Sequence, residues 1–351
     1  MYSKIKLDDY LYQITYTNLD YQKAYDYFRN NGSALGACSS FRAGNYFGRN
    51  YDWLYDNSVE FVVVTKNTIG IAGNISELTK SFVESGLPSP LYDIVPFYLL
   101  DGINKNGLVV SMNVVPTDYG NNISIPEIRK RTIIANMMIP RYLLDHFSNA
   151  IDAVNYLKNY TSIYNVNKLK NLGYELHFII ADRNNTFVVE LINNKLNILR
   201  QKVITNFHVS NVIFNKNGKV YTPSTQTELN NAIITNNITP NGCGLERYNL
   251  IKDLKSFSKR DIKQLLYDLR YSNTYRNLNW FTEFVGNGLT VNSSVKDYVK
   301  KIAPILDDLE YKSRDDSKLW QTVHSSLYDF NNLSLELNVQ ENFDKTFKFS
   351  L

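Results

Sequence analysis

The sequence predicts an α+β protein in which stacked antiparallel sheets are covered by helices. Three observations favour this class: β-branched runs come in hairpin-like groups, helical pairs separate these groups, and the strands do not follow a βαβ repeat. The 351 residues, 44% of them hydrophobic, are enough for one large domain or two ordinary ones. This composition excludes a disordered, collagen-like or coiled-coil chain.

The first part of the chain is predicted to contain one helix followed by strands. Residues 21–30 have helical spacing, and the Asn-Gly-Ser that follows would end this helix. Apolar and polar residues alternate on both sides of Gly44, which predicts a hairpin over residues 40–49. Three further strands are expected at residues 61–65, 68–72 and 107–115.

The clearest helical pattern lies at residues 128–147, where apolar side chains recur at helical spacing. Pro140 should kink or divide this helix because proline has no backbone N–H to donate. The remaining predictions are a helix at 151–160, a hairpin at 177–192, a strand at 202–210, a loop at 215–241, helices at 247–255 and 259–271, a hairpin at 320–339 and a last strand at 347–351.

Charge and composition exclude several classes of partner. The 38 basic and 34 acidic residues leave a net charge of +4, too small to indicate nucleic acid. The sequence contains no apolar stretch long enough to span a membrane, and residues 1–9 do not resemble a signal peptide. The two cysteines, Cys38 and Cys243, are expected to be free thiols in a reducing cytoplasm. The oligomeric state stays open, with a homo-oligomer among the alternatives.

Cys38 is the residue around which candidate chemistry gathers. The predicted hairpin would bring Arg49 and Asp52 back beside it. A guanidinium near a thiol favours the thiolate, which is the nucleophilic form. From spacing alone, however, a buried structural cysteine beside a surface ion pair is the simpler interpretation.

Histidines offer an alternative chemistry. A papain-like pair would need His177 or His208, but the sequence around Cys38 lacks the papain pattern. We therefore expect His177 to be a buried structural histidine. His146 and His324 have no partners at metal-ligand spacing, so we expect no metal ion and no other cofactor.

Several short segments follow Cys38 in a particular order. They are Cys-Ser-Ser-Phe at 38–41 with Gly-Arg-Asn-Tyr-Asp-Trp at 48–53, Leu-Asp-Gly-Ile-Asn-Lys-Asn-Gly-Leu at 100–108 with Ser-Met-Asn at 111–113, Leu-His-Phe at 176–178, Thr-Asn at 205–206, and Gly-Leu-Glu-Arg-Tyr at 244–248. Together they resemble the choloylglycine hydrolase family, which includes bile salt hydrolases and penicillin V acylases and is related to the penicillin acyltransferases. The resemblance covers residues 38–351.

The resemblance implies an N-terminal nucleophile hydrolase with a four-layer αββα fold, in which two stacked antiparallel sheets lie between helical layers. Residues 38–351 would form its single domain, and residues 1–37 a propeptide or extension. Cys38 would be the nucleophile, and its freed α-amino group the general base. Arg49 would lower the pKa of the thiol, and Asp52 would orient the amine.

The same resemblance assigns the remaining site residues. The side-chain amide of Asn206 and the backbone N–H of Asn113 would form the oxyanion hole. Arg247 would stabilise charge near the nucleophile. Because a free amine at Cys38 requires cleavage of the Ala37–Cys38 bond, the resemblance implies that the chain cuts itself there.

The implied reaction is hydrolysis of a linear, non-peptide amide in a small N-acyl substrate. An acyltransferase would use the same thioester but pass the acyl group to an amine instead of water. A non-catalytic binding protein, with residues 1–37 still attached and filling the pocket, is the alternative from another class. The acyl group and the amine are not specified by the sequence.

Overall fold

The computed structural model describes residues 2–30, 37–53, 58–73, 83–84, 89–116, 132–164, 174–192, 195–216, 219–221, 238–252, 258–271 and 321–351. Within these ranges, most strands belong to a nine-stranded sheet and a six-stranded sheet. None of the helices in the described ranges is long and apolar enough to cross a membrane.

The nine-stranded sheet contains the first strands of the chain. In spatial order its strands are β1 (Tyr2–Asp8), β2 (Leu11–Tyr16), β5 (Glu60–Val64), β6 (Thr68–Ala72), β7 (Leu99–Asn104), β8 (Val109–Pro116), β11 (Tyr174–Ala181), β12 (Thr186–Ile192) and β13 (Lys195–Leu199). Neighbouring strands are antiparallel except β2 and β5, which run parallel. The sequence analysis did not predict β1 and β2, and their place in the sheet makes residues 2–16 part of the fold.

The six-stranded sheet carries the predicted hairpin. Its strands are, in spatial order, β14 (Val203–Ile204), β3 (Ala37–Ala43), β4 (Tyr46–Trp53), β18 (Gln321–Asp329), β19 (Ser334–Val339) and β20 (Phe347–Ser350). Gly44 lies in the turn between β3 and β4 with φ +58°, a left-handed conformation that glycine adopts without a steric penalty. The closing hairpin and the last strand are confirmed.

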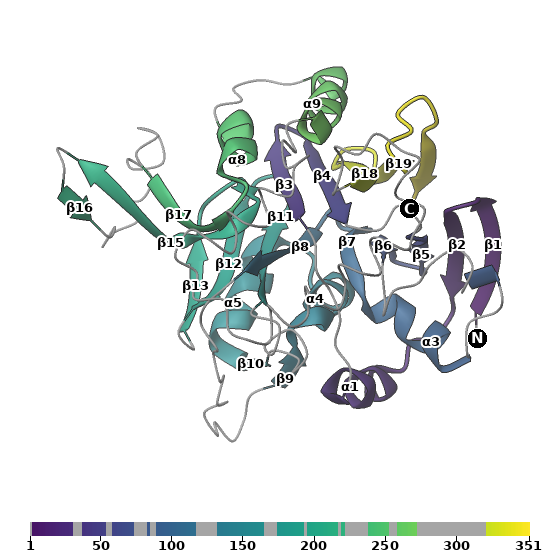
Figure 1. Ribbon diagram of the computed structural model, residues 1–351. Helices are drawn as coiled ribbons and strands as arrows, with labels where there is room; N and C mark the ends of the chain where they lie inside the picture. Colours follow the sequence, from purple (N-terminus) through teal and green to yellow (C-terminus); the bar gives the residue numbers. More distant parts are fainter. Residues whose placement is uncertain are drawn as a thin grey trace, which may run out of the picture.

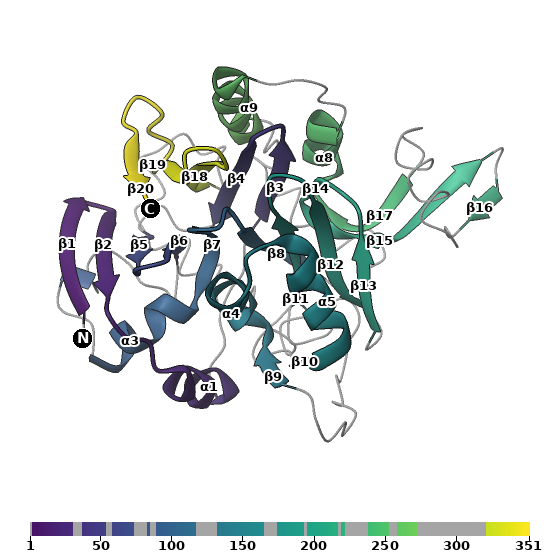
Figure 2. The same ribbon diagram turned by 180° about the vertical axis from the view of Figure 1, so that it is seen from behind.

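The two sheets stack face to face between helices. Helices α1 (Tyr21–Asn30), α4 (Ile139–His146) and α5 (Ala150–Tyr160) cover the nine-stranded sheet, while α8 (Leu245–Lys252) and α9 (Lys259–Tyr271) cover the six-stranded one (Figure 1). The same layer order is seen from behind (Figure 2). Phe41 and Phe47 of the smaller sheet share one buried cluster with Ile71 and Ile103 of the larger. The predicted αββα architecture is therefore confirmed.

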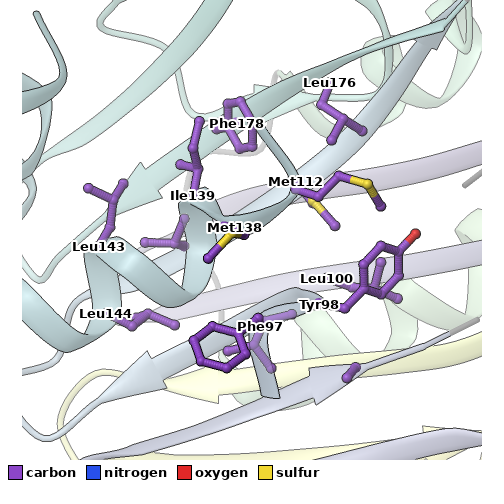
Figure 3. Close-up of a cluster of buried hydrophobic side chains, with 14 of the residues drawn as sticks. Phe97, Tyr98, Leu100, Met112, Met138, Ile139, Leu143, Leu144, Leu176 and Phe178 are labelled. Carbon is purple, nitrogen blue, oxygen red and sulfur yellow. The ribbon is translucent and has the colours of Figure 1, made fainter. Parts of the chain in front are cut away.

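A second buried cluster joins the nine-stranded sheet to its helical layer. Leu143 and Leu144 of α4 lie in this cluster with Met112 and Phe178 from the sheet (Figure 3). These side chains are at most 2% exposed. Removing apolar surface from water contributes about 25 cal/mol for each Å², so this interface helps to fix α4 on the sheet.

The long helix predicted at residues 128–147 is wrong in its first part. Residues Thr132–Ala135 form strand β9, which pairs in parallel with β10 (Thr161–Tyr164), and the 3₁₀ turn Asn136–Met138 follows. Helix α4 starts only at Ile139, so Pro140 lies in its first turn, where a missing N–H costs nothing. Residues 128–131 lie outside the described ranges.

The strand predicted at residues 202–210 is divided at Thr205. Its first part, β14, pairs with β3, while β15 (Asn206–Lys216) belongs to a small sheet with β16 (Lys219–Tyr221) and β17 (Ile238–Cys243). The loop predicted at residues 215–241 therefore contains strand segments, and residues 222–237 of it lie outside the described ranges. The break places Thr205 and Asn206 where the chain passes between two sheets.

Candidate active site

Cys38 lies near the start of β3 and is only 1% exposed. Three predicted site residues contact it. Its sulfur accepts a hydrogen bond from Nη2 of Arg49 at 3.5 Å, and its backbone N–H donates to Oδ1 of Asn206 at 2.8 Å. Its carbonyl oxygen accepts from Nη1 of Arg247 at 2.6 Å. The structure thus brings together residues separated by more than 200 positions in the sequence.

Arg49 connects the cysteine to a buried carboxylate. It lies on β4 opposite Ser40, and its Nη1 donates to Oδ2 of Asp101 at 2.9 Å. Arg49 and Asp101 are both fully buried. A charge-assisted bond of this kind, shielded from water, holds the guanidinium in one orientation, with Nη2 toward the sulfur.

The buried position of Cys38 disfavours the thiolate in the intact chain. Burial raises the pKa of Cys38, and the negative charge of Asp52 adds to this effect. The nearby guanidinium of Arg49 lowers the pKa, as the sequence analysis predicted, but it does not outweigh burial. Any nucleophilic role for Cys38 therefore needs a base that takes the thiol proton during the reaction.

Asp52 lies on β4, next to the start of β3. It pairs across the hairpin with Ala37, the residue that precedes Cys38. Its Oδ1 accepts a hydrogen bond from the hydroxyl of Thr322 at 2.6 Å, and its Oδ2 lies 3.7 Å from Nη1 of Arg247. The carboxylate is thereby held by Thr322 and lies near Arg247, which also contacts the carbonyl oxygen of Cys38.

The side-chain amide of Asn206 has a defined orientation. Its Oδ1 accepts from both the backbone N–H of Cys38 and Nη2 of Arg247, the latter at 2.7 Å. Only an oxygen can accept these two bonds, so the amide nitrogen points the other way. There Nδ2 donates to the carbonyl of Val114 at 2.7 Å. An oxyanion role for Asn206, which remains a prediction, would use the second hydrogen of Nδ2.

Asn113 lies on β8 beside these groups. Its side chain accepts from the hydroxyl of Ser40 at 2.8 Å and donates to the carbonyl of Thr205 at 3.1 Å. The side chain therefore links β3 to the turn that carries Asn206. The oxyanion role predicted for its backbone N–H stays a prediction.

His177 is a buried histidine whose ring nitrogens are both engaged. Nδ1 lies 3.2 Å from Oε1 of Glu190, and Nε2 lies 3.0 Å from the carbonyl oxygen of Thr205. These contacts agree with the predicted structural role. Burial lowers the pKa of His208 to about 4, so this second histidine is neutral at physiological pH.

Four residues of the site were not recognised in the sequence. Asp101 lies in the segment 100–108 of the family resemblance but was given no role. His324 was considered only as a metal ligand, and Glu60 and Thr322 were not considered. The sequence feature that could have indicated them is one they share: each is a polar residue within a strand, and each is buried. Among the described residues, no group of three or more His, Cys, Asp or Glu side chains is arranged to hold a metal ion.

Comparison with known proteins identifies the family. The model of the family described as acyl-coenzyme A:6-aminopenicillanic acid acyl-transferase matches residues 41–267, well over half of the chain. The chain belongs to this family. The match confirms the predicted grouping, which joined the choloylglycine hydrolases with the related penicillin acyltransferases. No curated protein sequence matches this member of the acyltransferase family.

Solved structures with some likeness to this family member were also found. A conjugated bile acid hydrolase from Clostridium perfringens is 15% identical, with 90% of this chain and 92% of that chain covered and a TM-score of 0.42. A penicillin V acylase from Agrobacterium tumefaciens is 12% identical, with coverages of 86% and 82% and a TM-score of 0.37. A Caenorhabditis elegans orthologue of N-acylethanolamine-hydrolyzing acid amidase is 12% identical, with coverages of 90% and 99% and a TM-score of 0.31. These likenesses are too distant to transfer an activity.

Proposed function

We propose that this protein is a cysteine N-terminal nucleophile hydrolase that cleaves a linear, non-peptide amide in a small N-acyl substrate. The observation that carries the proposal is the set of contacts at Cys38: Arg49 at its sulfur, Asn206 at its N–H and Arg247 at its carbonyl oxygen. A buried structural cysteine does not need two guanidinium groups and an amide directed at its own atoms. The need of such an enzyme for a free thiol fits the predicted cytoplasmic location.

The proposed cycle begins after the bond between Ala37 and Cys38 has been cut. The sulfur adds to the substrate carbonyl while the α-amino group of Cys38 takes the thiol proton and passes it to the leaving amine. The C–N bond breaks and a thioester forms. Water then adds to the thioester carbonyl, the acid is released, and the thiol is restored.

The cut itself would use the same thiol. The sulfur attacks the carbonyl carbon of Ala37, the amide C–N bond breaks, and the nitrogen of Cys38 gains the proton. Water hydrolyses the resulting thioester. The bond from the nitrogen of Cys38 to Oδ1 of Asn206 would persist after cleavage and would hold the new amine beside Asp52.

The decisive test is the mass of the purified chain under denaturing conditions, followed by N-terminal sequencing. We expect a large fragment beginning at Cys38 in the wild-type protein and an uncut chain in Cys38→Ala. A conservative Ser39→Ala variant should still be cut, because the hydroxyl of Ser39 accepts a hydrogen bond from Arg247 at 2.9 Å but takes no part in the proposed cut. An uncut wild-type chain that shows no amidase activity would contradict the proposal and favour a binding protein.

The acyltransferase alternative is favoured by the family match itself. In that case an amine, rather than water, would attack the thioester. Adding primary amines to a reaction with an N-acyl substrate, and measuring new amides by mass spectrometry, separates the two. A hydrolase should release the free acid as its main product.

A further inference from the structure

Arg49 belongs to a buried group of four ionisable residues. The group consists of Glu60 on β5, Asp101 on β7, His324 on β18 and Arg49 on β4, and all four are fully buried. His324 lies between the two carboxylates: its Nδ1 is 3.0 Å from Oε2 of Glu60, and its Nε2 is 3.2 Å from Oδ2 of Asp101. Asp101 in turn accepts from Arg49, so the contacts form a continuous line from Glu60 to the Cys38 sulfur.

The neighbours of His324 favour a doubly protonated ring. A carboxylate oxygen can only accept a hydrogen bond, so a ring nitrogen that faces one must donate, and both nitrogens of His324 face carboxylates. The other ring packed against it is that of Tyr51, at 5.3 Å between centroids. Burial alone would lower the pKa of His324, but Glu60 and Asp101 outweigh it and the pKa is raised.

With His324 as an imidazolium, the group is electrically balanced. Two cations, Arg49 and His324, face two carboxylates, Glu60 and Asp101. Without the imidazolium, both carboxylates would act on Arg49 alone, and the sulfur of Cys38 would lie near an excess negative charge. In a buried site such a charge is weakly screened and raises the pKa of a thiol.

We propose that His324, held as an imidazolium between Glu60 and Asp101, is a positioning residue that leaves the charge of Arg49 available to the sulfur of Cys38. His324 touches no reacting atom, so it acts through Asp101 and Arg49. Asp101 also accepts from the hydroxyls of Ser326 at 3.1 Å and of Tyr328, both on the same strand as His324. Strand β18 therefore both fixes the position of the Asp101 carboxylate, through Ser326 and Tyr328, and balances its charge, through His324. This inference rests on the proposed function, in which Cys38 is the nucleophile.

The test measures the rate of Cys38 alkylation by iodoacetamide against pH, with the label located by peptide mapping so that Cys243 is counted separately. In His324→Gln we expect the apparent pKa of Cys38 to rise by about one unit and the rate below that pKa to fall ~10-fold. In Glu60→Gln/His324→Gln the charges balance again, so the rate should return to within about threefold of wild type. His208→Gln, another buried histidine, is the matched control and should not change the profile.

A purely structural role for His324 gives a different pattern. In that case the alkylation rate of the double variant would be as far from the wild-type rate as that of His324→Gln. That result would overturn the inference. If His324→Gln does not fold, the double variant alone decides, because only charge balance predicts near-normal reactivity from it. The inference would also be overturned if Cys38 is alkylated in the wild-type protein and the pH profile of alkylation is the same in His324→Gln. That result would leave the proposed function standing.

A second measurement does not depend on reactivity. In ¹⁵N-histidine spectra, His324 should stay doubly protonated to a higher pH than an unperturbed histidine does. A His324 that becomes neutral at no higher pH than an unperturbed histidine would overturn the inference. A wild-type Cys38 that no alkylating agent reaches at any pH, in a chain that is also uncut, would overturn the proposed function and this role of His324 together.

Discussion

Asn206 contacts Cys38, Arg247 and Val114 through the two ends of its side-chain amide. Its oxygen accepts from Cys38 and Arg247, and its nitrogen donates to Val114. These are separate functions of the two ends of one amide, so a substitution can remove one end and keep the other.

Asn206→Asp keeps an oxygen toward Cys38 and Arg247 but removes the Nδ2 donor. If Nδ2 stabilises the oxyanion, the rate of self-cleavage should fall by ~10²–10³, the usual cost of one lost oxyanion donor. The rate is measured by following the cut in freshly folded protein. Asn206→Ala, which also loses the acceptor, should in addition lower the melting temperature. Normal cleavage in a folded Asn206→Asp protein would remove Asn206 from the oxyanion hole.

At the scale of elements, the first half of β15 is held by a buried carboxylate. Glu190 on β12 accepts from the backbone N–H groups of Val209 and Ser210 at 2.7 and 2.8 Å, from the hydroxyl of Ser210, and contacts His177. Burial alone would raise the pKa of Glu190, but these partners outweigh it, and the pKa is lowered. The ionised form is therefore favoured by the fold.

This lowered pKa makes stability depend on pH in one direction. The contribution of ionised Glu190 is present above the ordinary carboxyl pKa and is lost as the pH falls through the lowered value. Glu190→Gln should cost about 1–3 kcal/mol of unfolding free energy at neutral pH. Urea unfolding should show this difference shrinking as the pH falls below about 4. A difference that stays constant with pH would contradict the role of the charge.

Local patterns predicted several elements whose residues are neighbours in sequence. The hairpin around Gly44 and the helices at 21–30 and 259–271 agree with the structure. The error at residues 128–147 arose because apolar spacing does not distinguish a helix from a strand followed by a turn, whereas the β-branched start and Pro140 do. Strands β1 and β2 form a local hairpin that the sequence analysis missed, and β2 also pairs with β5, which is distant in sequence.

The site shows the same limit. Arg49 was predictable because a hairpin brings it to Cys38 from nearby in the chain. The group of Glu60, Asp101 and His324 was not, since three separate strands meet there only after the two sheets have stacked. His324 was set aside because a single histidine has no spacing pattern to interpret.

At the scale of the whole molecule, the N-terminal segment is part of the larger sheet. Leu11 and Ile14 of β2 are fully buried, and Ala24 and Phe28 of α1 are at most 1% exposed. Strand β2 lies between β1 and β5, and Phe28 stacks on Tyr98 at 6.1 Å between centroids. Residues 2–30 therefore contribute side chains to the core of the protein.

If the bond between Ala37 and Cys38 is cut, the two fragments should stay together without a covalent link. We expect them to elute as one species in size-exclusion chromatography and to separate only in denaturant, because the buried surface of β2 and α1 remains paired. The uncut Cys38→Ala protein is the reference. Loss of the small fragment from the cut native protein would contradict this expectation.

Strand β18 has a consequence for the order of events during synthesis. It lies between β4 and β19, and it supplies Thr322 to Asp52 and His324 to Asp101. The ribosome releases this strand long after Cys38 and Arg49 have emerged. A nascent chain thus carries the thiol without the groups that hold its neighbours in place. Under the proposed function, chemistry at Cys38 would therefore have to wait until translation has delivered β18.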